Sequence, residues 1–226
     1  MRSDEPRESF KLQTKDTTTP RAVIFFGSDG TGKTTQATFV IQELRKRGLK
    51  TRRAWIRGRH LFAFAISQVL LKLGYSQTIV QVGAPGGKIL DARKLPEKRF
   101  WSFFEFLSVV PLAITRMYVP LLLGYRIVAE RYLIDTVVYD GYFLGGYFGP
   151  YARILLHMIP KNCLIVHLDA KKSDVLARRQ GDILSENFVD FQLASYRRLA
   201  SSLNAISIDT SSNDVDTVRR LVAERL

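Results

Sequence analysis

The chain has 226 residues, which is long enough for one large domain with a well-buried core. Its hydrophobic fraction of 46% and its charged fraction of 24% are those of a globular protein and exclude a chain too polar to fold. The net charge of +13 fits either a basic surface for nucleic acid or a membrane, or a phosphate-handling site on a surface rich in arginine. Because the basic residues are spread along the chain, the second interpretation is favoured.

The amino-terminal end and the cysteine usage suggest where the protein works. Residues 1–20 are polar, so we expect a flexible tail before a folded domain that spans 21–226. The tail lacks the apolar core of a secretory signal. The single cysteine, Cys163, cannot form an internal disulfide and lies in an apolar run, where we expect a small buried hydrophobe. These features fit a reducing compartment, and we expect a cytoplasmic protein.

The longest apolar region, residues 100–125, contains Glu105 and Arg116 and is interrupted by Pro111 and Pro120. No part of it reaches the roughly 18 uncharged residues that a membrane-spanning helix needs. We therefore expect a helix that is bent by its prolines and buried in the core or in a homodimer interface. A membrane-associated patch is the alternative.

Strand and helix patterns alternate along the folded part of the chain. Strands are expected at 22–26, 51–56, 126–130, 163–168 and 205–208. Helices are expected at 34–47, 61–73, 96–123, 151–158, 175–179, 188–203 and 215–226, and a further helix starts after residue 132. This alternation predicts an α/β fold, a five-stranded parallel sheet with helices on both faces.

Residues 27–34, which read GSDGTGKT, match the phosphate-binding pattern G-x-x-x-x-G-K-[ST] without a mismatch. They lie between the first strand and the first helix, which predicts a P-loop NTPase fold. Glycines let consecutive backbone N–H groups point into one concavity, and the helix N-terminus adds positive charge there. Lys33 would reach the terminal phosphates of a nucleotide, and the Thr34 hydroxyl would ligate Mg²⁺. The expected nucleotide-binding residues are Gly27, Ser28, Asp29, Gly30, Thr31, Gly32, Lys33, Thr34 and Thr35.

The same segment carries a family resemblance. Residues 26–36, FGSDGTGKTTQ, resemble the opening of thymidylate kinases. Glu130-Arg131-Tyr132, with Thr136 and then the run 139–141, is similar to the family's D-R-Y…S…Y-Q-G segment. Residues 168–178 resemble the strand and helix that lead into the family's lid, and 206–209 its final strand. The resemblance covers about 21–226 and identifies the chain as a divergent member of this family.

The resemblance implies a nucleotide kinase that takes ATP with Mg²⁺ as donor and a nucleoside monophosphate as acceptor, with thymidylate as the expected acceptor. It also implies a homodimer. Lys33, Arg131, Arg178 and Arg179 would be catalytic, the last two as arginines of the lid. The acceptor set would be Asp29, Arg57, Phe106, Arg131 and Tyr139, with Arg59 close enough in sequence to replace Arg57. Glu130 would hold Mg²⁺ through water or orient Arg131, and Thr34 would be the other metal ligand.

The chain also departs from the family at the positions that read the base. Val110 stands where the family has an arginine, and Asp140 stands where many members have glutamine. A kinase for a nucleoside or another small alcohol or phosphate therefore stays open, and for an alcohol Asp29 or Glu130 would be the base. A third hypothesis is a non-catalytic nucleotide-binding protein docked to nucleic acid or a membrane surface.

Overall fold

The computed structural model describes residues 19–56, 61–79, 87–90, 94, 98–146, 148–178 and 186–226. The predicted site residues Arg57 and Arg179 lie outside these ranges, as do residues 1–18 of the predicted tail. Thr19, the first described residue, is already buried.

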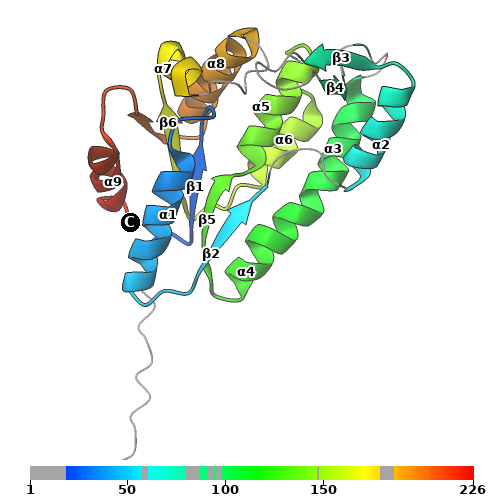
Figure 1. The fold of residues 1–226 in the computed structure, drawn as a ribbon. Coiled ribbons are helices and arrows are strands. Elements are labelled where there is room, and N and C mark those ends of the chain that lie inside the picture. Colours follow the sequence, from blue (N-terminus) through cyan, green and yellow to red (C-terminus); the bar gives the residue numbers. More distant parts are fainter. Residues whose placement is uncertain are drawn as a thin grey trace, which may run out of the picture.

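A five-stranded sheet, parallel throughout, forms the centre of the molecule (Figure 1). Its strands are β1 (Ala22–Phe26), β2 (Thr51–Trp55), β5 (Arg126–Arg131), β6 (Cys163–Asp169) and β7 (Ile206–Asp209). They lie side by side in the order β2-β5-β1-β6-β7. The predicted α/β fold with a five-stranded parallel sheet is therefore confirmed. Since the strands are parallel, the loops after β1, β5, β6 and β7 all leave the sheet at its carboxyl edge.

Helices connect these strands, close to the predicted positions. They are α1 (Lys33–Lys46), α2 (Leu61–Lys72), α3 (Lys98–Ala113), α4 (Val119–Leu122), α5 (Leu133–Phe143), α6 (Pro150–His157), α7 (Lys172–Arg178), α8 (Glu186–Ser202) and α9 (Val215–Ala223). The predicted helix over 96–123 is divided between α3 and α4 by a turn of π-helix, Ile114–Tyr118. Pro111 lies inside α3, where its missing N–H leaves a gap in the regular hydrogen bonding just before that turn.

Alternate residues of β1 belong to two hydrophobic clusters, one on each face of the sheet. Ala22, Ile24 and Phe26 belong to the larger cluster, together with side chains of α5, α6, α8 and the α3–α4 segment. Val23 and Phe25 belong to the second cluster, with α1 and α9. All five side chains are fully buried. Helices therefore cover both faces of the sheet, as the sequence predicts, and β1 is held rigidly at its centre.

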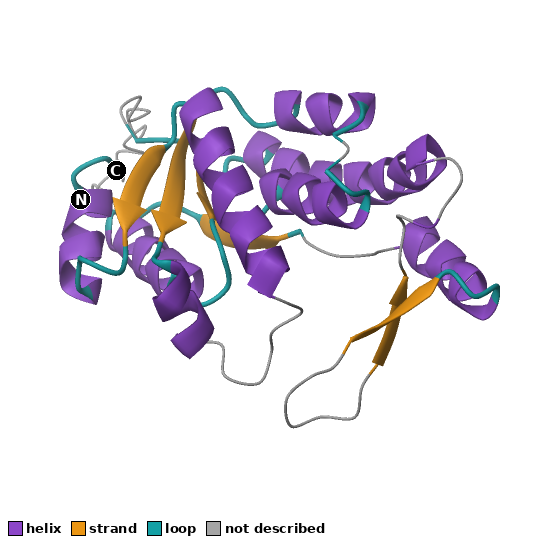
Figure 2. Cartoon of the chain, turned by 90° about the horizontal axis from the view of Figure 1, so that it is seen from above, coloured by secondary structure: helices purple, strands orange, loops and turns teal. Residues whose placement is uncertain are grey.

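The chain also contains a β-hairpin that the sequence does not predict. Strands β3 (Ser76–Ile79) and β4 (Gly87–Leu90) pair in antiparallel fashion. Figure 2 shows the hairpin and α2 at the end of the molecule distant from the five-stranded sheet. Each strand is only four residues long, and neither shows a clear alternation of apolar and polar residues, so the pattern gives little signal.

The apolar region around α3 and α4 meets the criteria for a membrane span by length and composition. Among the described residues, one helical segment does so, Phe100–Leu122, with a mean hydropathy of 1.4. In this segment 39% of the most apolar window is buried inside the protein. Part of the segment packs on the main core, through Val109, Ala113 and Met117. It therefore contributes to the core while leaving apolar side chains exposed.

Candidate active site

The glycine-containing loop from 27 to 32 connects the buried end of β1 to the start of α1. Gly27 has a φ of +140°, and a Cβ built on it would lie 2.3 Å from the carbonyl oxygen of Leu168 in β6. Gly32, with a φ of +85°, is the N-cap of α1, and a Cβ built there would meet no atom within 4 Å. Gly27 is therefore required by packing, whereas Gly32 borders open space at the N-terminus of the helix.

Hydrogen bonds within the loop hold it in shape. The carbonyl oxygen of Ser28 accepts hydrogen bonds from the Thr31 hydroxyl at 2.9 Å and from Lys33 Nζ at 2.5 Å. The Ser28 hydroxyl points the other way and donates to Gln192 Oε1 of α8 at 3.2 Å. Ser28, Thr31 and Gln192 are all buried. The loop is thus anchored to the helix behind it, and the Lys33 ammonium group lies over its backbone.

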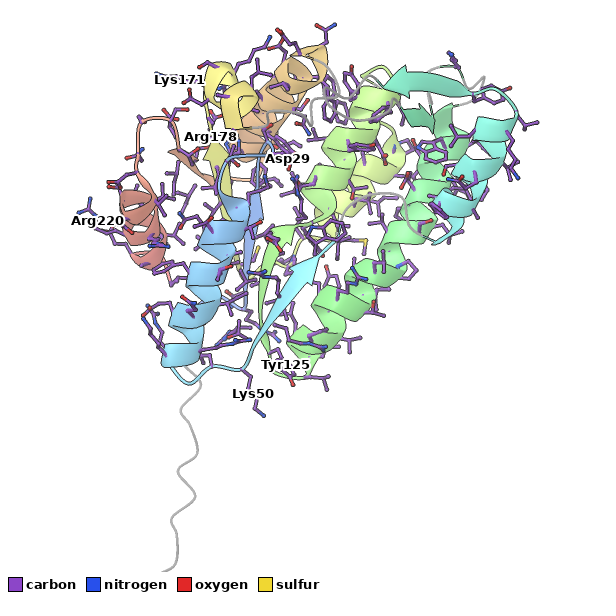
Figure 3. All side chains as sticks on the ribbon, viewed as in Figure 1. Asp29, Lys50, Tyr125, Lys171, Arg178 and Arg220 are labelled. Carbon is purple, nitrogen blue, oxygen red and sulfur yellow. The ribbon has the colours of Figure 1, made fainter. Side chains whose placement is uncertain are left out.

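Three cations reach an open pocket of about 420 Å³ beside this loop. Lys33 comes from α1, Arg131 from the end of β5 and Arg178 from the end of α7. The remaining lining residues are Asp29, Gly30, Gly32, Thr34, Trp55 and Glu130. Asp29 lies between two of the cations, with its Oδ1 3.8 Å from Lys33 Nζ and in an ion pair with Arg131. Figure 3 shows Asp29 and Arg178 close together beyond the ends of the strands.

Arg131 is held in place from behind by α5. Its Nη1 donates to Asp135 Oδ1 at 2.8 Å. The same oxygen of Asp135 accepts from the Tyr196 hydroxyl at 3.0 Å, and its Oδ2 accepts from the backbone N–H of Tyr132 at 3.2 Å. Arg131 and Asp135 are both buried, so their charges compensate each other where water does not. The guanidinium is therefore fixed in direction before any ligand arrives.

Asp135 and Tyr196, which hold the predicted site residue Arg131 in place, are not among the residues that the sequence motifs single out. One signal was available, because Asp135 is a lone acid in the mostly apolar run 133–138 and follows Arg131 by four residues. The part played by Tyr196 depends on the packing of α8 against α5, which the sequence pattern does not reveal.

Arg178 connects the loop to the end of β7, which lies on the other side of β1 from β5. Its guanidinium donates to the Gly30 carbonyl at 3.3 Å and to the Thr210 carbonyl at 3.0 Å, beyond the end of β7. A second pocket of about 410 Å³ lies on that side, lined by Thr35, Gln36, Asn213, Asp214 and Val215, among others. Gly30, Gly32 and Arg178 line both pockets. The glycine loop therefore has a cavity on each side, and Arg178 stands between them.

The two predicted metal ligands, Thr34 and Glu130, line the same pocket. The Glu130 carboxylate is 3.7 Å from Arg53 Nη1, which neutralises part of its charge. Among the described residues, no group of three or more His, Cys, Asp or Glu side chains could hold a metal ion. A hydroxyl and a carboxylate are nevertheless what Mg²⁺ requires when phosphates and water supply its other ligands, so the residues fit that ion.

Phe106 and Tyr139, predicted to bind the acceptor, lie in aromatic clusters rather than in the lining of the pocket. The Phe106 ring is 5.3 Å from that of Tyr151 and packs against the main core. Tyr139 packs against Phe143 and Phe188, with ring centroids 4.6 Å and 6.1 Å away. Neither residue is among those that line the two pockets beside the loop. In this structure both side chains serve packing between helices.

His167, in the strand next to β1, is buried directly behind the site. Its ring stacks on Phe26 at a centroid distance of 5.0 Å, and its Nδ1 is 2.9 Å from the Ser207 hydroxyl. Its Nε2 makes no hydrogen bond with a described residue. Burial disfavours the imidazolium and lowers the pKa of His167 to about 4; the carboxylate of Asp169 opposes this change, whereas Arg197 and Lys33 add to it. At neutral pH the ring is neutral.

The chain matches no known family model, and no match was found among the curated proteins.

Proposed function

We propose that the protein is a nucleotide kinase that transfers a phosphoryl group from ATP, with Mg²⁺, to a nucleoside monophosphate. The resemblance to thymidylate kinases favours thymidylate as the acceptor. It also favours a P-loop NTPase fold for the protein. The observation that carries the proposal is the convergence of Lys33, Arg131 and Arg178 on one pocket beside the glycine loop. Each cation comes from a different element, so the fold brings together like charges that repel one another. An anion with several charges, such as a chain of phosphates, would compensate them.

In this proposal one pocket binds the phosphate donor and the other binds the acceptor. The pocket lined by Thr35, Gln36 and Val215, between α1 and α9, would hold the nucleoside part of ATP, because the predicted acceptor residues Asp29 and Arg131 line the other pocket. The pocket lined by Asp29, Trp55 and Arg131 would hold the acceptor. The glycine loop lies between them, so a phosphoryl group passing from one to the other would cross the N-terminus of α1.

Catalysis would depend on positioning and on the neutralisation of charge. Lys33 and the backbone N–H groups of the loop would hold the donor phosphates, and Arg131 would orient the acceptor phosphate. Arg178 would stabilise negative charge that develops on the transferred group. When bound, Mg²⁺ would neutralise phosphate charge between Thr34 and Glu130. An acceptor phosphate is already nucleophilic, so no general base is required.

A second candidate function rests on Asp29. Its carboxylate pairs with Arg131, whose other neighbour is the carboxylate of Asp135. With two acids beside it, Arg131 has less charge to offer an acceptor phosphate. The same arrangement places a carboxylate in the acceptor pocket, where it could take the proton of a hydroxyl group. An alcohol such as a nucleoside is therefore the alternative acceptor.

The test is ADP formation by the purified protein with ATP and Mg²⁺, measured against a panel of nucleoside monophosphates and nucleosides. Lys33→Ala should abolish turnover while the protein stays folded. Lys46→Ala, at the exposed far end of the same helix, is the matched control and should retain it. Turnover with a nucleoside in place of the monophosphates would establish the alternative. If the protein binds ATP but shows no turnover with any acceptor, the proposed kinase activity is refuted.

We also propose a homodimer, on the evidence of exposed apolar side chains along α2 and α3. Phe64, Val69, Phe100, Phe103 and Leu107 are each more than a third exposed. A surface of this kind on two neighbouring helices is typical of a buried interface. Sedimentation velocity should give a dimer mass, and Phe103→Glu should shift it to the monomer.

A further inference from the structure

Two leucines project from the molecule at the end remote from the candidate active site. Leu122 and Leu123, at the end of α4, are 82% and 65% exposed. Among the described large apolar residues, Leu122 is the most exposed, and Leu123 comes third after Leu73, which is 67% exposed. Gly124 follows with a φ of +82° and turns the chain back into β5. This turn therefore lies at the amino edge of the sheet, opposite the edge where the glycine loop lies. We call Leu122 and Leu123 the leucine tip.

A basic run of the chain lies beside the leucine tip. The chain reads RKRGLKTRR from 45 to 53, and this run contains no acid. It is placed beside the tip because Arg126 N–H donates to the Lys50 carbonyl at 2.7 Å, and Thr51 of β2 pairs with Arg126 of β5. Figure 3 shows Lys50 and Tyr125 together at this end. Tyr125 lies under the Arg52 guanidinium, 5.6 Å from ring centroid to Cζ.

The charge of this surface has little internal compensation. Arg45, Arg47 and Lys50 are exposed and form no ion pair with a described residue. Two other cations of the run are paired, Lys46 with Glu43 at 3.4 Å and Arg53 with Glu130 at 3.7 Å. Arg45, Arg47 and Lys50 are thus available to an external anion. Residues 1–18 add no net charge, since they contain four basic and four acidic residues.

From this juxtaposition we propose that the leucine tip and the basic run 45–53 dock the protein on an anionic lipid bilayer. Exposed leucines gain from entering the acyl boundary, and flanking lysines and arginines gain from anionic headgroups. Nucleic acid would use the cations alone, whereas a bilayer uses both groups. In this orientation the carboxyl edge of the sheet faces away from the membrane, so the pockets stay open to solvent. The proposal stands independently of the proposed kinase activity.

Co-flotation with vesicles tests the proposal, using the full-length protein and vesicles of phosphatidylcholine alone or with about one third phosphatidylserine. We expect binding to the anionic vesicles that falls steeply between low and high salt. Leu122→Ser with Leu123→Ser should lower partitioning at least about tenfold through lost apolar burial. Arg45→Glu with Lys50→Glu should lower it more, since each cation near the surface contributes about fivefold.

Matched controls separate the tip from the rest of the surface. Leu73→Ser removes a leucine of similar exposure just after the end of α2, and Lys171→Glu with Arg220→Glu reverses two exposed charges on another face (Figure 3). Both should bind vesicles like the wild type. The proposal is overturned if the wild-type protein does not bind anionic vesicles. It is also overturned if the leucine variant binds them unchanged, or if the tip variants change only the oligomeric state or heparin binding. ADP formation by the leucine variant should stay at the wild-type rate, which keeps this test separate from that of the kinase.

Discussion

Two glycines offer a sharp comparison, because they share a backbone conformation and differ in position. Gly32, at the start of α1, has a φ of +85°, and Gly48, after its end, has a φ of +74°. A Cβ built on either residue would meet no atom within 4 Å. Alanine at either position therefore introduces only the left-handed conformation, about 1–2 kcal/mol, offset in part by the stiffer unfolded chain. We expect both variants to lose about 1 kcal/mol of unfolding free energy.

Their effects on activity should differ greatly. Gly32 lines both pockets beside the loop, so its new methyl group would occupy the space where phosphate oxygens approach the helix N-terminus. Gly32→Ala should lower turnover about 100-fold, the cost of disturbing one hydrogen-bond donor in a charge-stabilising site. Gly48→Ala should leave turnover unchanged. Urea denaturation and the ADP assay on the same preparations give both quantities. Equal activity of the two variants, at equal stability, would refute the assignment of the loop as the phosphate site.

Three further predictions concern the supports of the site. Gly27→Ala should cost about 3 kcal/mol or more, because its Cβ would lie 2.3 Å from the Leu168 carbonyl oxygen in a buried strand; a loss below about 1 kcal/mol in urea would contradict this packing. Asp135→Asn should cost about 3 kcal/mol by leaving the buried Arg131 guanidinium undercompensated, and an unchanged denaturation midpoint would argue against the ion pair. The folded pKa of His167, about 4 against an ordinary 6.5, means that the unfolded state binds the proton first as pH falls. Stability should therefore drop by up to about 3 kcal/mol from pH 7 to 4, and His167→Gln should flatten that slope.

The sequence predicts most of the central sheet because each of its strands is a local feature. The run Ala22–Phe26 is apolar throughout, as a strand buried on both faces must be, and the glycines after it mark its end. Arg131 ends β5, and Lys33 follows β1 across the glycine loop, so the parallel order brings them to one edge of the sheet. Their meeting in one pocket is therefore foreseeable from the pattern alone.

The remaining features depend on contacts between distant segments. Asp135 could be suspected from its sequence, but its partner Tyr196 is 61 residues away on another helix. For Phe106 and Tyr139 the sequence does not decide between two roles, since the same ring can stack on a base or pack against other aromatic rings, as both do in the structure. The two short strands of the β3–β4 hairpin gain their structure from each other, so neither has a pattern of its own.

The most direct test of the account is calorimetric titration of the protein with ATP and Mg²⁺, because the central claim is that residues 27–34 hold nucleotide phosphates. We expect saturable binding with a Kd between about 1 μM and 1 mM, the range of typical enzyme KM values. Lys33→Ala should weaken it at least about tenfold through the loss of one charge-assisted contact. Lys46→Ala should bind like the wild type. Failure of the wild type to bind ATP, or equal binding by Lys33→Ala, would contradict the claim.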